Sequence, residues 1–362
     1  MTTSDSGFAR RVALASAIVT AFVVVTLTAW HLIDVWLLAF GGVLFAVALR
    51  GLGQTIAERA PLGAHAWTGI VCAGVFALAL LGIVALGPEF VQGLNGLREI
   101  LPDGVQDLQA LIGRHPWLEQ LADKAPEAVS GGEVGAELAR RFGDVLSRAT
   151  GIVSSLVGAL VGMFVIVIVA VYASLSPGQY AGALAAILPE QRRARLGTVL
   201  GDLATSLRWW LIGRLASMAV VGLLTGIGLA LLGVPSPITL GVLAALLSFV
   251  PNVGPILSLV PAVLAGLTVG PSTALYTVGL FLAVQTIESY LVTPLIQQRA
   301  VTLPPAFVIV VQLAFGAAFG LLGLLFATPL AVVVKVLMQR LWIEDVLGHR
   351  GEREPEPEAG AG

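Results

Sequence analysis

Charged side chains are scarce in this sequence. They make up 12% of its 362 residues, while hydrophobic residues make up 57% and the mean hydropathy is +0.93. Soluble domains carry about 25% charged residues, so the composition excludes a soluble globular protein. Uncharged windows of about 20 residues recur through most of the chain, which is the length a helix needs to cross a bilayer core of about 30 Å. The sequence therefore predicts an all-α, polytopic membrane protein.

Residues that support enzyme chemistry are also few. Cys72 is the single cysteine and cannot form an intrachain disulfide, and Lys124 and Lys335 are the only lysines. Neither lysine stands in a Gly-x-x-x-x-Gly-Lys-Ser/Thr motif, so the phosphate cradle of an ATPase is missing. The four histidines are scattered and form no His-Glu-x-x-His metal helix: His31, His65, His115 and His349. We therefore expect no enzymatic activity, cofactor or metal site.

Six windows predict complete transmembrane helices. The first follows Arg10 and Arg11 and is longer than the core of a signal peptide, typically about 7 to 15 residues, so we expect it to stay in place as a helix. The predicted spans are residues 12–30, 35–49 with an extension to 53, 67–87, 151–175, 215–232 and 272–293.

The distribution of charge divides the chain into four regions. Residues 1–87 form a group of three spans, and residues 88–150 carry sixteen charged residues with apolar positions at helical spacing. There we expect amphipathic helices outside the hydrocarbon, interrupted by turns such as Leu101-Pro-Asp-Gly104. Residues 151–343 form a core that includes an arginine-rich loop between the fourth and fifth spans. Residues 344–362 form an acidic, proline-rich tail that we expect to be disordered.

Two apolar pairs are broken in a way that complete spans are not. Segments 238–250 and 254–267 are each about 20 Å long and are separated by Pro251-Asn-Val-Gly254. Proline ends a helix, and glycine permits backbone angles that other residues resist. A second pair, 306–319 and 320–341, is divided around Gly316 to Gly320. These patterns predict helical hairpins near 238–267 and 306–341; the alternative is a plain turn between short tilted spans.

Irregular backbone at membrane depth is tolerated only where protein or a water-filled cavity satisfies its polar groups. Half-helix ends placed there offer partial charges and free hydrogen-bonding groups to a polar solute. The two broken pairs therefore indicate a transport site between them.

One acidic residue, Glu288, lies well inside an apolar span. Such residues are expensive in a membrane and usually mark an ion or substrate path. Gln285, Ser289 and Thr293 accompany it on the same helix, so a polar stripe is predicted. In the alternative interpretation, Glu288 caps a helix or pairs with Arg299 or with another helix.

The positions of the arginines predict the orientation of the chain. Arginines close to the ends of spans favour the cytoplasmic side of the membrane. If each hairpin enters and leaves the membrane on one side, all four groups of arginines fall on the cytoplasmic side. The N- and C-termini are then cytoplasmic and residues 88–150 are external. The net charge is −2 and no strongly basic block is present, so nucleic acid is not expected as a partner. The arginines used are Arg10, Arg11, Arg50, Arg59, Arg192, Arg193, Arg195, Arg208, Arg214 and Arg299.

Several stretches carry a specific resemblance: Ile212-Gly-Arg214, Gly226-Ile-Gly-Leu-Ala-Leu-Leu-Gly-Val234, Leu247-Ser-Phe-Val-Pro-Asn-Val-Gly-Pro255 with Pro261, Glu288 followed by Thr293-Pro294, Gly320-Leu-Leu-Gly323 and Thr328-Pro-Leu330. In this order they resemble the AI-2E family of transporters, specifically from residue 206 to 340 and in layout alone over residues 1–175. One departure is Arg214, where many relatives have glutamine.

The resemblance implies a secondary transporter of the inner membrane, assembled as a homopentamer, whose protomers act independently by an elevator-like motion. Some members of the family are assigned to export of the quorum-sensing molecule autoinducer-2 and others to sodium/proton exchange. The resemblance places the tips of the two hairpins at positions of this sequence, and the polar stripe around Glu288 adds further candidates. Together, the expected solute-binding residues are Pro251, Asn252, Gly254, Pro255, Gln285, Glu288, Ser289, Gly316 and Gly320.

Three functions remain open at this point. The first is an exporter of a small polar solute such as autoinducer-2, in which the hairpins hold the solute near the membrane midplane. The second is a sodium/proton antiporter in which Glu288 binds the ion. The third is a membrane scaffold without transport, whose external helical region binds a partner.

Overall fold

The structure is a computed structural model of the chain. It describes residues 32–58, 63–114, 156–292 and 303–346, together with Pro294 and separate residues between 14 and 30. Over these residues all regular elements are helical, and five helices are long and apolar enough to cross a membrane, or six if one bent pair counts as a span. The prediction of an all-α, polytopic membrane protein is confirmed. Of the predicted first span, 12–30, thirteen residues between Leu14 and Trp30 are described and all of them are helical, while the other six lie outside the described residues.

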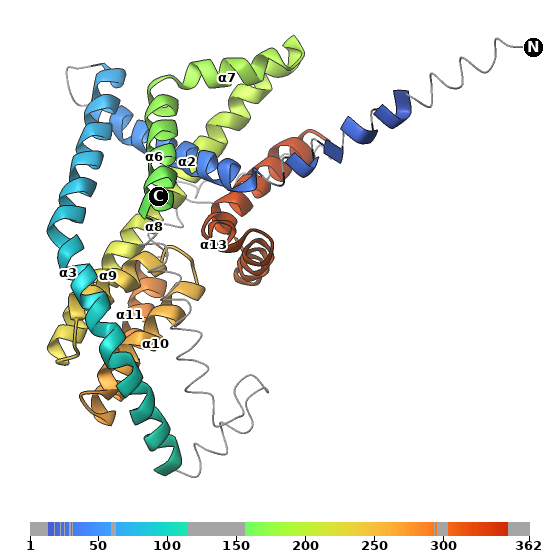
Figure 1. Cartoon of the computed structure of the whole chain (residues 1–362). Helices are drawn as coiled ribbons and strands as arrows, with labels where there is room; N and C mark the ends of the chain where they lie inside the picture. The colour runs from blue at the N-terminus through green and yellow to red at the C-terminus, as the bar shows by residue number, and fades with distance from the viewer. Residues whose placement is uncertain are drawn as a thin grey trace, which may run out of the picture.

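Three helices form the first group. Helix α2 (Ile33–Ala57) packs along α6 (Leu156–Leu175) and against α3 (Ala64–Arg114), as Figure 1 shows. Small residues make this contact close: a Cβ atom on Gly42 would lie 2.5 Å from the Cβ of Val169. Lipid tails are as apolar as these side chains, so close packing of small residues, more than burial, is what holds membrane helices together.

Helix α3 runs far beyond its predicted span. It is 51 residues long and passes through Pro88 and Pro102 without ending, so the turn predicted at Leu101-Pro-Asp-Gly104 was wrong. Its later part is fixed by tertiary contacts, because Leu97 and Val105 are buried against the first hairpin. These contacts outweigh the hydrogen bond that a proline removes from a helix. Residues 115–155, which include the rest of the expected amphipathic region and the start of the predicted fourth span, lie outside the described residues.

Helix α8 (Glu190–Leu231) replaces the expected arginine-rich loop. It follows α7 (Pro177–Ala186), a short helix bent by 83° from the end of α6, and it is continuous for 42 residues. The loop prediction was wrong because arginine, leucine and glutamine are good helix formers whatever their charge. Ion pairs also hold this polar half: Arg195 lies 3.0 Å from Glu344, and Arg340 lies 2.9 Å from Asp202.

The first hairpin comprises α9 (Pro237–Leu247) and α10 (Val253–Leu267), joined by a turn at residues 248–252. It packs on α8, on α3 and on α11 (Pro271–Ile287). Helix α11 continues as η1 (Glu288–Val292), a short π-helical segment. Segments of this kind are rare and are found frequently at functional sites.

The second hairpin is formed by α13 (Pro305–Leu337), which continues into η2 (Met338–Glu344). Gly320 has φ 62° and ψ −145°, which is not helical. Beyond it the chain doubles back, since the Nε2 atom of Gln312 donates a hydrogen bond of 3.3 Å to the Oγ1 atom of Thr328. Sixteen residues of straight helix would separate these residues by about 24 Å. The last predicted segment, 344–362, is described only to Val346, and its first two residues, Glu344 and Asp345, pair with Arg195.

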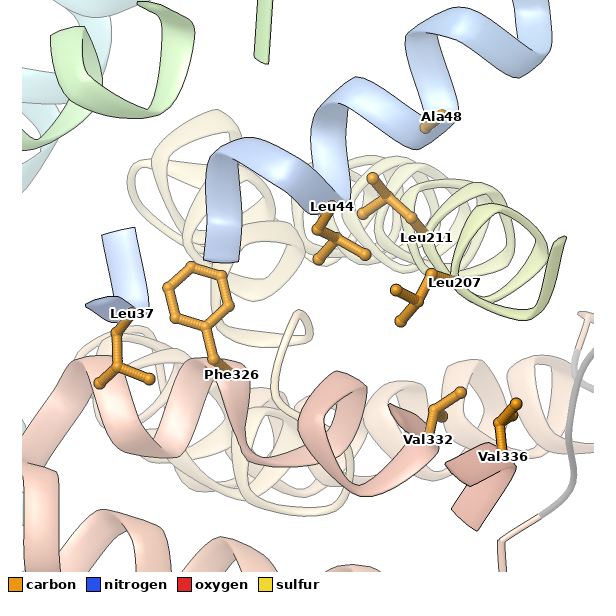
Figure 2. Packing of buried hydrophobic residues seen from close by; sticks show 8 residues of the cluster. All are labelled: Leu37, Leu44, Ala48, Leu207, Leu211, Phe326, Val332 and Val336. Atoms are coloured by element: carbon orange, nitrogen blue, oxygen red, sulfur yellow. The ribbon is translucent and has the colours of Figure 1, made fainter. Parts of the chain in front are cut away.

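A hydrophobic cluster joins α2, α8 and α13. Figure 2 shows its side chains pointing toward one another from the three helices: Leu37, Leu44, Ala48, Leu207, Leu211, Phe326, Val332 and Val336. Phe249, from the turn of the first hairpin, and Phe319, next to the turn of the second, both pack against it. The turns of the two hairpins therefore rest on one core.

Candidate functional site

The carboxylate of Glu288 is the centre of a buried polar cluster. Its side chain is 13% exposed and stands at the junction of α11 and η1. The Oγ atom of Ser217 donates a hydrogen bond of 2.5 Å to Oε1, and the Nε2 atom of Gln285 donates one of 2.9 Å to Oε2. The Nη1 atom of Arg214 lies 3.6 Å from Oε1. Both carboxylate oxygens are therefore engaged, by groups from two helices.

Arg214 connects this acid to the first hairpin. Its Nε atom donates a hydrogen bond of 3.0 Å to the backbone carbonyl of Phe249, and its side chain is 12% exposed. Phe249 lies just past the end of α9, where helix carbonyls lack partners and favour a positive charge. The guanidinium is therefore buried inside the protein. It contacts the turn of the hairpin and the acid of the neighbouring span at the same time.

Helical spacing on α8 places the groups that meet Glu288. Leu211, Arg214 and Ser217 follow one another at intervals of three residues, so they share one face of the helix. Ser217 is buried, and Leu211 belongs to the cluster of Figure 2. This face of α8 therefore packs against the hydrophobic cluster through Leu211 and, one to two turns further along, supplies Arg214 and Ser217 to Glu288.

The turn of the first hairpin is tight and carries an exposed side chain. Asn252 has φ 64° and ψ −45°, and the N–H of Val253 donates a hydrogen bond of 2.7 Å to the carbonyl of Pro251. This is a γ-turn of the rare, strained kind with positive φ. Gly254 follows, and a Cβ atom there would overlap the backbone carbonyl of Leu247. Strain of this kind persists only where the surrounding structure enforces it, and it gathers at functional sites.

The predicted site residues fall into two places. Gln285 and Glu288 are brought together and are linked through Arg214 to the turn that contains Pro251 and Asn252. Gly254 and Pro255 follow this turn in the first turn of α10. Gly316 and Gly320 lie at the turn of the second hairpin, which packs on α8 and α2. Ser289 is exposed in η1. Thr293 and Arg299 lie outside the described residues.

Sequence reasoning missed the partners of Glu288. Ser217 and the carbonyl of Phe249 were not among the expected site residues. Arg214 was used for the orientation of the chain and noted as a departure from the family, and it was not expected as a partner of Glu288. A signal for Arg214 was present, because a cation on the apolar face of a membrane helix predicts an acidic partner. Pairing with another helix, which was part of the alternative interpretation of Glu288, is what the structure shows.

The charges of this cluster balance. A guanidinium and a carboxylate together carry no net charge, which suits a site at membrane depth. Removing one partner of a buried ion pair typically costs about 3–5 kcal/mol, because the other is left uncompensated. Over the residues that the structure describes, no group of three or more His, Cys, Asp or Glu side chains could hold a metal ion.

A separate apolar groove of about 1070 Å³ lies between α2, α3 and α6 and is reached by Leu321 and Leu322 of α13. The Sγ atom of Cys72 stands in its lining, 3.5 Å from the Oγ atom of Ser174. Its walls are otherwise apolar, so a polar solute is not expected to bind there.

Interrupted helices inside a polytopic bundle are a feature of membrane transporters, and ionisable residues buried in such a bundle usually mark an ion or substrate path. The chain belongs to the AI-2E family, because the profile of the AI-2E family transporter matches residues 17–342. The resemblance noted in the sequence is thereby confirmed.

The names of similar proteins agree with this assignment. The chain is 26% identical to YueF of Bacillus subtilis strain 168, provisionally named a transport protein, over 71% of this chain and 73% of the relative. It is 28% identical to a protein of Mycobacterium tuberculosis strain CDC 1551 with the same provisional name, over 77% and 73%. It is 26% identical to the AI-2 transport protein TqsA of Escherichia coli K12, over 37% and 40%.

Proposed function

We propose that this chain is a secondary transporter that exports a small polar solute, with autoinducer-2 as the first solute to test. The observation that carries the proposal is the link from the hairpin turn through Arg214 to Glu288. It joins irregular backbone to a buried acid inside the apolar part of the fold, which is the combination that transporters use at their solute sites. The printed name of TqsA supplies the choice of autoinducer-2.

The mechanism we propose is alternating access. Backbone groups of the first turn and the amide of Asn252 hold the solute, while the part of the protein that bears the hairpins moves in an elevator-like way. Pro251, Pro255, Ser289, Gly316 and Gly320 complete the proposed solute path. A homopentamer in the inner membrane, with both termini cytoplasmic, is the assembly that the family resemblance supports.

The test is an Asn252→Gly variant. Glycine adopts positive φ without cost, so the turn is retained while the amide is removed. A neutral hydrogen bond is worth about 0.5–1.5 kcal/mol, so we expect efflux of autoinducer-2 from loaded proteoliposomes to fall by about 2- to 10-fold. The matched control is Gly279→Ala, at an exposed position on α11 where a Cβ atom meets nothing within 4 Å.

Two outcomes contradict the proposal in different ways. If the unaltered protein moves no autoinducer-2, that solute is wrong, and a comparison of metabolites exported by cells lacking and overproducing the protein must supply another. If Asn252→Gly transports as fast as the unaltered protein, the amide of Asn252 does not bind the solute.

The same proteoliposomes distinguish the proposed exporter from the two alternative functions, a sodium/proton antiporter and a scaffold. A sodium/proton antiporter would exchange the two ions and lose that exchange in Glu288→Gln. A scaffold would produce no flux of any solute. The relatives are named for transport, which supports transport over a scaffold.

A further inference from the structure

We infer that Arg214 determines the ion specificity of this transporter: its guanidinium occupies the place beside Glu288 that a coupling cation would take, so that the site works without binding Na⁺ or a proton there. This inference rests on the proposed function only in assuming that the protein is a transporter. The claim that Arg214 prevents cation binding at Glu288 can be measured without any transported solute.

The first argument is the kind of group that surrounds the carboxylate. Sodium, like other hard cations, is held by several oxygen acceptors. Around Glu288 the structure places the hydroxyl of Ser217, the amide of Gln285 and the guanidinium of Arg214. The hydroxyl and the amide each have an oxygen that can turn toward a cation, whereas the guanidinium has donors only. Arg214 is therefore the group that closes the place beside the carboxylate to a cation.

The second argument is charge. Arginine stays protonated in proteins, so its charge is a fixed part of the site. With Nη1 at 3.6 Å from Oε1, the pair is neutral before any ion arrives. A second cation would meet repulsion from the guanidinium, whereas a site with the carboxylate alone would need a proton or Na⁺ to cross the apolar part of the membrane.

The third argument is that Arg214 is held in place. Its Nε atom donates a hydrogen bond to the carbonyl of Phe249, and its side chain is 12% exposed. The guanidinium is therefore fixed between the hairpin turn and the acid, and it does not extend to solvent as a flexible surface arginine would.

The experiment compares Arg214→Gln with the unaltered protein, using Na⁺ alone as the probe. Glutamine keeps a hydrogen-bond donor and removes the charge. Thermal unfolding of the purified protein in NaCl and in choline chloride of equal concentration reports specific Na⁺ binding. We expect no difference in Tm between the two salts for the unaltered protein, and a rise of several degrees in NaCl for Arg214→Gln. The rise should disappear in the double variant Arg214→Gln/Glu288→Gln.

A second measurement keeps the inference testable if Arg214→Gln does not fold. Proteoliposomes of the unaltered protein under an imposed pH gradient should take up no more radioactive sodium than liposomes without protein, and Arg214→Lys, which keeps the charge, should behave in the same way. Sodium uptake by the unaltered protein that is lost in Glu288→Gln would overturn the inference. A folded Arg214→Gln variant with no sodium response would also overturn it.

The outcome for the proposed function is read separately. Efflux of autoinducer-2 from the same proteoliposomes should proceed equally in sodium and in choline buffers. Failure of that efflux, with the sodium results as expected, refutes the proposed solute and leaves the assignment of Arg214 standing.

Discussion

At the scale of single residues, Gly254 shows how little room the first turn leaves. A Cβ atom there would overlap the carbonyl of Leu247. Gly254→Ala must therefore push the two arms of the hairpin apart, and overpacking of this kind typically costs about 1–3 kcal/mol. We expect a lower Tm in detergent, measured by the fluorescence of Trp210, a half-buried residue whose ring contacts that of Phe249 in this turn.

The control for this prediction is again Gly279→Ala. An alanine in a helix interior is more favourable than a glycine by about 0.5–1 kcal/mol, so the Tm of the control should stay the same or rise slightly. Equal Tm values for Gly254→Ala and the unaltered protein would show that the hairpin opens freely. It also follows that a valine at 254 would test packing rather than solute binding, so Asn252→Gly is the better probe of the solute.

The sequence was sufficient to find Glu288 and Gln285, because both lie on one helix and their spacing of three residues places them on one face. It was not sufficient to find Ser217 and Arg214 as their partners. Those residues are about seventy positions away in the chain, and only the packing of α8 against α11 brings them together.

At the scale of elements, the second hairpin can be tested by a disulfide. A Cβ atom on Gly316 would lie 3.7 Å from the Cβ of Leu324, and disulfides have Cβ–Cβ distances of about 3.5–4.5 Å. In a Cys72→Ser background, we expect Gly316→Cys/Leu324→Cys to form an intramolecular disulfide on mild oxidation. Loss of free thiol, measured by maleimide labelling, reports it.

The matched control has the same spacing along an unbroken helix. Ala219 and Ile227 are both exposed on α8, and eight residues of straight helix separate them by about 12 Å. Cysteines at these two positions should stay reduced under the same oxidation. If the 316/324 pair also stays reduced, the chain does not turn back at Gly320.

Breaks in helices were predictable where proline and glycine cause them, as at Pro251 and Gly320, because those residues act on their own backbone. Continuity was not predictable where it depends on contacts with other elements. The turn expected at Pro102 is absent because the flanking residues of α3 are packed on the first hairpin. The loop expected from Arg192 onward was predicted from the polarity of that segment alone. The segment is a helix instead, because polar residues such as arginine and glutamine are compatible with a helix.

At the scale of the whole molecule, the orientation in the membrane is still a prediction. Gln106 is exposed on the extended part of α3, and Gln191 is exposed at the start of α8. In a Cys72→Ser background, we expect Gln106→Cys to react with a membrane-impermeant maleimide on intact cells and Gln191→Cys to react only after permeabilisation. The reverse pattern would refute cytoplasmic termini.

The all-α class and the presence of several long apolar helices followed from composition, since a helix that crosses a bilayer needs about 20 apolar residues and satisfies its own backbone groups. The arrangement of the helices did not follow from it. Nothing in the sequence pattern indicated that both hairpin turns would rest on a core shared by α2, α8 and α13, because lipid-facing and protein-facing apolar positions have the same composition.

The continuity of α8 has a consequence for how the chain can vary. This helix pairs near its start with the end of the second hairpin, through Asp202 and Arg340, and further along with Glu288, through Arg214 and Ser217. Each residue of an α-helix advances the phase by about 100°. A single insertion between the two regions would turn one set of partners away from its target. Substitutions of α8 residues outside these partners can therefore be tolerated, while changes in the residue count of the helix cannot.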